Sequence, residues 1–227
     1  MIPSGVIFDV DGTLVDSNDA HARAWTEALQ ERGQSVPFDR VRALIGMGGD
    51  KLLPAAAGLS ADSAEGKAVS ERRAAIFRER HLPHLRAFDG ARDLVRELKD
   101  RGFRLAVASS AEERDLRPLL AIAGAEDLHD ARASGDDAER SKPDPDIVRA
   151  ALGKLGSSAA EAIMVGDTPY DVEAARRAGV DCIGLRCGGW SDRDLAGAVA
   201  VYDGPRDLLS RIESSPIARR QGARSAV

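Results

Sequence analysis

The chain has 227 residues, of which 43% are hydrophobic and 30% charged, and its formal net charge is -5. This length corresponds to about one and a half average domains, and the composition excludes a fibrous repeat or gross disorder. With 32 Lys and Arg against 37 Asp and Glu, the chain has no basic excess that would favour a nucleic-acid backbone. We therefore expect no nucleic-acid partner.

Signals for membranes, secretion and disulfide bonding are also missing. No apolar run approaches the roughly 18 residues that a membrane span requires, and the first residues lack the pattern of a secretory signal. The two cysteines, Cys182 and Cys187, are too few for a disulfide framework or a structural zinc site. We expect a cytoplasmic protein that has no membrane partner.

Short apolar runs alternate with segments of helical length along most of the chain. They cover 5–10, 103–109, 162–166, 180–185 and 198–202, and a weaker strand is expected around Leu128. Such alternation indicates βαβ units, and runs that are apolar throughout indicate parallel strands buried on both faces. We therefore predict an α/β fold with a doubly wound parallel sheet and helices over 90–100, 112–123 and 144–155.

The segment between the first two strands, residues 11–102, is far longer than one crossover helix. Ala24, Trp25, Ala28 and Leu29 recur there at helical spacing, and a second helical stretch covers 61–80. These patterns predict an inserted helical domain. Its predicted bounds are 16–85, which leaves 1–15 and 86–213 as a discontinuous core and 214–227 as a disordered tail.

Two carboxylates stand where the first predicted strand ends. Asp9 and Asp11 are two residues apart, so a strand sends both to the same side, and Gly12 permits the sharp exit that exposes them. Carboxylates so close raise each other's pKa unless a cation lies between them. A hard divalent ion such as Mg²⁺ would relieve that repulsion, although the pair alone also fits an ordinary turn or helix cap.

Asp167 and Asp171 follow a second strand, that at 162–166. In an open parallel sheet, ligands collect beyond the carboxyl ends of the strands, so residues distant in sequence can meet there. We expect these two acids to lie near Asp9 and Asp11.

Two further segments offer what a phosphate group needs. Ser109 and Ser110 end the strand at 103–109 and precede a helix, where hydroxyl and backbone N–H groups favour an anion. Lys142 precedes a helix start defined by prolines and offers a positive charge to a phosphoryl oxygen. Each signal is weak alone, but together they lie on successive strand ends in one consistent order.

This order resembles the haloacid dehalogenase (HAD) superfamily, in its phosphatase branch. The motifs are Asp9-x-Asp11-Gly12-Thr13, Ser109, Lys142 and Gly166-Asp167-x3-Asp171. The insertion resembles the α-helical cap of the subfamily that contains phosphoglycolate phosphatases and β-phosphoglucomutase. The resemblance implies a Rossmann-like core whose cap closes over a small phosphate monoester, and hydrolysis through an aspartyl-phosphate.

The resemblance also implies a role for each motif residue. Asp9 would be the nucleophile, and Asp11 would act as general acid and then as general base. Ser109 and Lys142 would bind the transferring phosphoryl group.

For the metal, the resemblance implies Mg²⁺ held by Asp9, Asp167 and the backbone carbonyl of Asp11, with Asp171 in support. A second set of residues is predicted to contact the phosphate or the rest of the substrate, and these are Thr13, His21, Gly48, Lys51 and Ser110.

Three functions share this pattern: a phosphatase, a β-phosphoglucomutase-like mutase and a non-catalytic phosphate-binding protein. His21 matches a position that is occupied in the mutases, but Ile45 and Gly49 replace the basic residues that those mutases carry, which favours hydrolysis. Asp11 argues against a dehalogenase, which expels halide without a general acid, and the complete motif set argues against a non-catalytic protein. We expect a monomer that acts on a phosphoglycolate-like acid or a phosphosugar.

Overall fold

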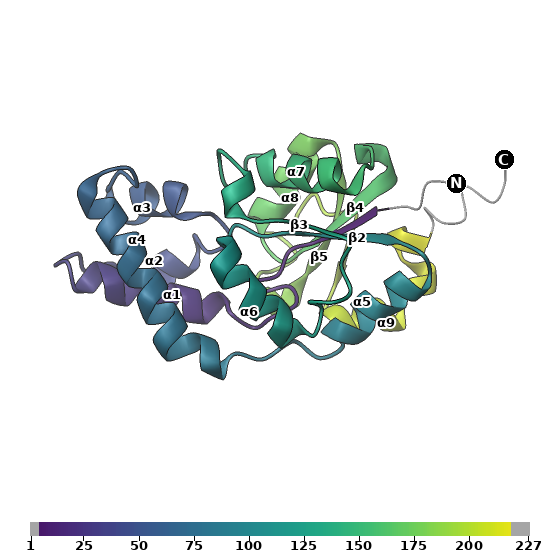
Figure 1. Ribbon diagram of the computed structural model, residues 1–227, viewed down its shortest axis with the longest axis horizontal. Coiled ribbons are helices and arrows are strands. Elements are labelled where there is room, and N and C mark those ends of the chain that lie inside the picture. The colour runs from purple at the N-terminus through teal and green to yellow at the C-terminus, as the bar shows by residue number, and fades with distance from the viewer. Residues whose placement is uncertain (1–4, 219–227) are drawn as a thin grey trace.

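The computed structural model describes residues 5–218, which form a parallel sheet with helices on both faces and a helical domain beyond one end (Figure 1). The sheet has the order β3-β2-β1-β4-β5-β6, and every neighbouring pair is parallel. The strands are β1 Gly5–Phe8, β2 Arg104–Ala108, β3 Ala131–Ala133, β4 Ala162–Gly166, β5 Asp181–Leu185 and β6 Ala200–Tyr202. The predicted doubly wound α/β fold is confirmed.

One strand position was predicted wrongly. Leu128 does not begin a strand, because its backbone N–H bonds the carbonyl of Ala125 in the turn after a helix. The edge strand β3 starts three residues later, where Ala131 pairs with Ala106 of β2. Leu128 still packs against the core, which accounts for its apolar character.

Alternate residues of each strand bury themselves against different helices. Ile7 and Met164 contact a cluster built by α7 (Asp146–Leu155) and α8 (Pro169–Ala178). Val6 and Val165 belong to the opposite cluster, which includes α5 Ala91–Asp100, α6 Glu113–Ala123 and α9 Pro205–Ser210. Helices therefore cover both faces of the sheet, as apolar parallel strands require (Figure 1).

The helical domain, called the cap below, lies at the left of Figure 1. Its helices are α1 Asn18–Gln30, α2 Phe38–Arg42, α3 Gly49–Ala57 and α4 Ala64–Ile76, followed by a π-helical turn at Phe77–His81. The helix predicted from residue 61 starts at Ala64, because the Ser63 hydroxyl accepts the Gly66 N–H and caps it. The two short helices α2 and α3 were not predicted.

The end of the described chain packs more closely than expected. Ser215 and Ile217 are fully buried, although disorder is predicted from residue 214. An apolar contact for Ile217 offsets the polar composition around it. The remainder of that predicted tail, 219–227, and residues 1–4 of the predicted core lie outside the described residues.

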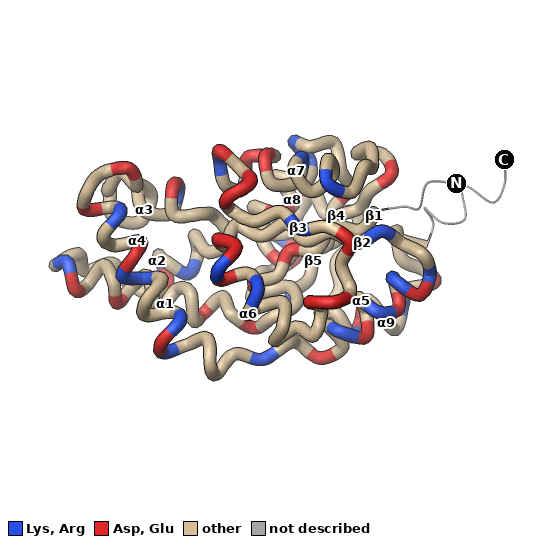
Figure 2. The backbone as a smooth tube through the Cα atoms, viewed as in Figure 1, with Lys and Arg blue, Asp and Glu red and all other residues tan. Residues whose placement is uncertain are grey.

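Charge and helix length add two observations on the described part of the chain. Acidic and basic residues are interspersed along most helices (Figure 2), and many form surface ion pairs such as Arg72 with Glu31. Within residues 5–218, no helix has both the length and the apolar composition needed to cross a membrane.

The chain passes between core and cap through two segments that lie side by side. Asp16 N–H bonds the Arg86 carbonyl, Phe88 N–H bonds the Leu14 carbonyl, and Val15 bridges Ala87 in antiparallel fashion. Both passages therefore leave the core at one place, close to the strand ends where the predicted site lies.

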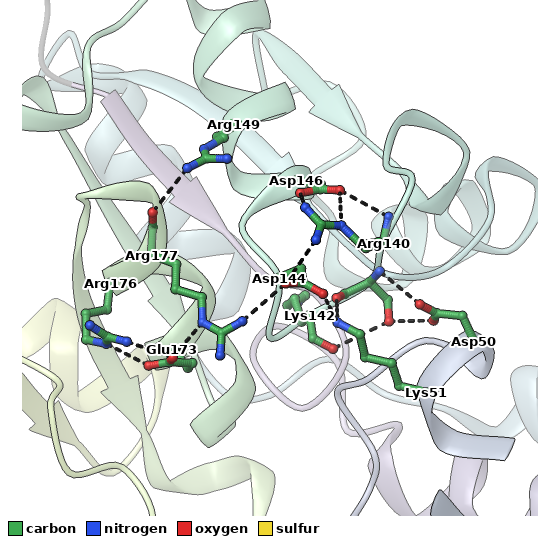
Figure 3. A network of polar contacts seen from close by, with 11 residues as sticks. Asp50, Lys51, Arg140, Lys142, Asp144, Asp146, Arg149, Glu173, Arg176 and Arg177 are labelled. Atoms are coloured by element: carbon green, nitrogen blue, oxygen red, sulfur yellow. Dashed lines mark hydrogen bonds and ion pairs between the residues drawn. The ribbon is translucent and has the colours of Figure 1, made fainter. Parts of the chain in front are cut away.

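A second contact joins cap and core at the start of α3, and we call it the clasp (Figure 3). Its members are Asp50 and Lys51 of the cap and Ser141 and Asp144 of the core. Asp50 accepts the Ser141 hydroxyl at 2.5 Å and its backbone N–H at 3.2 Å. The Lys51 ammonium donates to the Ser141 carbonyl and to Asp144, 2.5 Å away. These bonds hold the cap on the loop that carries Lys142.

Replacing Lys51 by Met should loosen the clasp without unfolding the protein. We expect faster amide hydrogen exchange over residues 45–53 and an almost unchanged melting temperature, because a partly exposed ion pair adds little to global stability. Hydrogen-exchange mass spectrometry checks this, with Lys67→Met, which alters an exposed lysine of α4, as the matched control. Equal exchange in the two variants would show that Lys51 does not hold the cap.

Candidate active site

The predicted site residues converge at the carboxyl ends of three neighbouring strands. Asp9 follows β1, and its backbone N–H bonds the Val165 carbonyl of β4 at 2.9 Å. Asp167 follows β4 itself. Ser109 follows β2, and its N–H bonds the Ala133 carbonyl of β3 at 3.1 Å. Because β1 lies between β2 and β4, the sheet order alone brings these segments together.

A buried ion-pair network forms the centre of the site. Lys142 Nζ donates to Asp9 Oδ1 at 2.6 Å and to Asp171 Oδ1 at 2.7 Å, and all three side chains are at most 5% exposed. Asp171 is held in turn by Thr168, whose N–H and hydroxyl donate to its second oxygen. Burial would lower the pKa of Lys142, but the two carboxylates outweigh it and raise that pKa above its ordinary value.

The network carries more negative charge than one lysine can balance. Asp9, Asp167 and Asp171 can each present an oxygen within 4.8 Å of the other two. Burial raises the pKa of Asp9 to about 7, and the nearby carboxylates of Asp171 and Asp11 add to the rise. Burial, together with Asp171 and Asp9, also raises the pKa of Asp167 well above its ordinary value. Closely spaced carboxylate oxygens of this kind suit a hard divalent cation.

Asp167 is oriented by donors and enclosed by glycines. Thr13 Oγ1 donates to one of its oxygens at 3.0 Å and Asn18 Nδ2 to the other at 2.8 Å. A Cβ on Gly188 would lie 1.8 Å from Asp167 Oδ2, and one on Gly12 would lie 2.3 Å from it. Backbone therefore packs directly on this carboxylate, and no side chain fits at either glycine.

Asp11 is contacted by residues of the cap. His21 Nε2 lies 2.8 Å from Asp11 Oδ1, and the Ser17 hydroxyl donates to the same oxygen at 2.5 Å. Burial alone would raise the pKa of Asp11, but His21 and Ser17 hold it below its ordinary value. The His21 ring stacks on Phe77 with 3.9 Å between the ring centroids, which fixes the plane of the imidazole.

A cavity lies between this network and the cap. The core lines it with Asp9, Asp11, Ser110, Ala111 and Lys142, and the cap lines it with His21, Trp25, Arg73 and residues 45–49. The Ser110 hydroxyl is buried and has no hydrogen-bond partner within residues 5–218, so it is available to a ligand. Ser109 Oγ accepts the Ala111 N–H at 3.1 Å and shapes this turn.

The residues predicted to contact substrate divide between the cavity and its surroundings. His21, Gly48 and Ser110 line the cavity. The Thr13 hydroxyl is bonded to Asp167, and the Lys51 ammonium is held in the clasp, so neither side chain is among those lining the cavity.

Sequence reasoning missed two residues of the site, Ser17 and Asn18. Both lie where the chain enters the first helix of the cap, and both donate to motif carboxylates. A polar pair at a helix start is usually a cap, so the sequence alone gave no reason to single it out.

Comparison with known proteins agrees with this geometry. A family model described as haloacid dehalogenase-like hydrolase matches residues 6–185. A phosphoglycolate phosphatase from Rhodospirillum rubrum is 37% identical over 213 residues, which are 89% of this chain and 88% of that protein. An N-acetylmuramic acid 6-phosphate phosphatase from Pseudomonas aeruginosa is 29% identical over 217 residues, 92% of this chain and 94% of that protein.

A solved structure is similar over nearly the whole fold. The crystal structure of a hydrolase from Pseudomonas syringae has a TM-score of 0.86 and 31% identity, and it covers 93% of this chain and 98% of that one. The family resemblance of the motifs is therefore confirmed, and the chain belongs to the haloacid dehalogenase-like hydrolases.

Proposed function

We propose that this hydrolase is a magnesium-dependent phosphatase that acts on small phosphate monoesters through an aspartyl-phosphate intermediate. The observation that carries the proposal is the buried ion pair of Asp9 and Lys142 beside the cavity. Asp11 lines the same cavity and contacts His21 of the cap. A nucleophile, a cation for the phosphoryl group and a proton donor thus face one enclosed space. The same three roles follow from the family motifs.

The first step forms a bond between an Asp9 carboxylate oxygen and phosphorus. Lys142 holds Oδ1 of Asp9, which restricts the carboxylate to one orientation. As the new bond forms, the bond from phosphorus to the ester oxygen breaks, and Asp11 in its protonated form gives its proton to the departing oxygen. Because His21 and Ser17 lower the pKa of Asp11, that form is the minor one in the free enzyme. Lys142 and Ser109 would bind phosphoryl oxygens and stabilise their charge, and the unpartnered Ser110 hydroxyl beside Ser109 would add a donor.

The second step returns the enzyme to its starting state. A water molecule attacks phosphorus, the bond to Asp9 breaks, and Asp11 takes the proton from the water. His21 and Ser17 keep the Asp11 carboxylate turned toward the cavity, since both contact Oδ1. Phosphate then leaves, and Asp9 is again a free carboxylate.

The acidic cluster fits the proposed metal. Asp9, Asp167 and the Asp11 carbonyl would hold Mg²⁺, with Asp171 in support. When bound, the ion supplies positive charge that lets an anionic nucleophile approach an anionic phosphate. Oxygen donors, raised carboxylate pKa values and the glycine-lined enclosure of Asp167 all support a hard cation here.

The substrate that we propose is a phosphoglycolate-like acid or a small phosphosugar. Of the relatives named above, one is a phosphatase of phosphoglycolate and the other a phosphatase of a phosphosugar, N-acetylmuramic acid 6-phosphate. Ile45 and Gly49 line the cavity in this chain. The cap loop therefore offers no cationic side chain at those two positions to hold a bisphosphorylated sugar, which supports a phosphatase over a mutase.

The decisive change is Asp9→Asn, which keeps the size of the side chain and removes the nucleophile. We expect phosphate release from a panel of small phosphomonoesters to fall at least about 1,000-fold, and to vanish for the unaltered enzyme when EDTA replaces Mg²⁺. Thermal melting checks that the variant is folded. Full activity of the variant would contradict the covalent mechanism, and conversion of glucose 1-phosphate to glucose 6-phosphate without phosphate release would establish the mutase instead.

Gly188→Ala tests the metal site through Asp167. The new methyl group would displace the Asp167 carboxylate, so we expect the Mg²⁺ concentration that gives half-maximal activity to rise about 10-fold or more. Gly153→Ala is the matched control, because it makes the same change in open space on α7. The control should leave the magnesium dependence unchanged, and an equal effect of both substitutions would argue against a metal at Asp167.

A further inference from the structure

Arg73 of α4 is the arginine that the cap places in the wall of the active-site cavity, together with Trp25, Met47 and the facing Lys142 of the core. Its guanidinium lies over the Trp25 ring, with Cζ 4.9 Å from the ring centroid. Its Nε atom is buried and has no hydrogen-bond partner in the part of the chain that the structure describes. Among residues 5–218, no carboxylate forms an ion pair with it.

Neighbouring arginines of the same region are paired. Arg72 makes two hydrogen bonds to Glu31, at 2.6 and 2.7 Å. Arg78 bonds Asp115 at 3.0 Å, and Arg80 is paired with Glu27. Arg73 therefore differs from them in keeping its donors unused although it is the one that lines the cavity.

Arg73 is partly exposed, but burying its Nε without a partner is costly, because that N–H loses water and gains no acceptor. Burial accordingly lowers the pKa of Arg73, and the more distant carboxylates of Asp115, Glu112 and Asp11 compensate in part. A planar fork of free N–H donors, with one face on an aromatic ring, is well suited to a bidentate bond with a carboxylate or a phosphate.

The other residues of the cap wall cannot take this role. His21 is engaged with Asp11, and the loop at 45–49 contributes an isoleucine, a methionine and three glycines. The core side of the cavity, with Lys142 and Ser110, is the part that suits the reacting phosphate. A cation on the cap side then faces the part of the substrate that lies away from the reacting phosphate.

We propose that Arg73 determines specificity by binding a second anionic group of the substrate, so that the preferred ester carries a carboxylate or a second phosphate near the scissile one. This inference rests on the proposed phosphatase activity and narrows its substrate class. A short acid phosphate fits it better than a neutral sugar phosphate.

Three esters of similar length separate the possibilities. 2-Phosphoglycolate has a carboxylate beside the phosphate, ethylene glycol bisphosphate has a second phosphate, and ethyl phosphate has neither. The unaltered enzyme should prefer one of the first two. In Arg73→Gln, kcat/KM for that ester should fall about 10- to 100-fold, mainly through KM, whereas the value for ethyl phosphate should change less than about 3-fold.

Two further variants complete the test. Arg73→Lys keeps the charge but loses the fork, so its loss should be intermediate. Arg72→Gln removes the adjacent arginine, which points to Glu31, and should leave all three esters unaffected. Thermal melting shows whether each variant is folded. If Arg73→Gln does not fold, the comparison of the three esters is made with Arg73→Lys.

The outcomes are distinct. Equal losses of kcat/KM for all three esters would mean that Arg73 only offsets the negative charge of the site. No loss for any ester would mean that Arg73 does not bind substrate. Either result overturns the inference. If the unaltered enzyme hydrolysed none of the esters, the proposed function would fail. Calorimetric binding of 2-phosphoglycolate to the unaltered protein and to Arg73→Gln would then decide the inference independently, with equal affinities overturning it.

Discussion

The buried ammonium of Lys142 is the interaction on which the rest of the site depends. It joins the end of β1, the loop before α7 and the first turn of α8, because Asp9 and Asp171 both accept from it. Removing one partner of a buried ion pair costs about 3–5 kcal/mol, since the remaining charge is left without water or counter-charge. The three segments are therefore held together by charge as well as by apolar packing.

The side chains of that network are held firmly in place, but their negative charges are not fully neutralised. Three carboxylates converge and one ammonium faces them, so part of the negative charge stays unbalanced. Burial, with the neighbouring carboxylates adding to it, raises the pKa values of Asp9 and Asp167. Close approach of the Gly188 backbone prevents Asp167 from turning away to relieve the repulsion. The fold thus stores an electrostatic cost that a bound cation would remove, and the phosphate chemistry that we propose needs that cation in the same place.

Most of the core site follows from the sequence, and most of the cap site does not. Asp9, Ser109 and Asp167 converge as predicted, because residues at strand ends are placed by the order of a parallel sheet. The contacts of Asn18 and Lys51 depend instead on how a helical domain rests on the core, which no local pattern encodes. Lys51 was predicted to contact substrate, but the orientation of α3 directs its ammonium to Ser141 and Asp144.

The cap does more than cover the cavity, because several of its contacts complete groups of the core. His21 and Ser17 give Asp11 its partners, Asn18 orients Asp167, and the clasp holds the loop next to Lys142. Moving the cap away would break these bonds together, so the core would lose the orientation of the proposed proton donor, Asp11, and of one proposed metal ligand, Asp167. A substrate that bridges Lys142 and Arg73 would favour the closed arrangement, and binding energy from its non-reacting end would then help to assemble the catalytic groups.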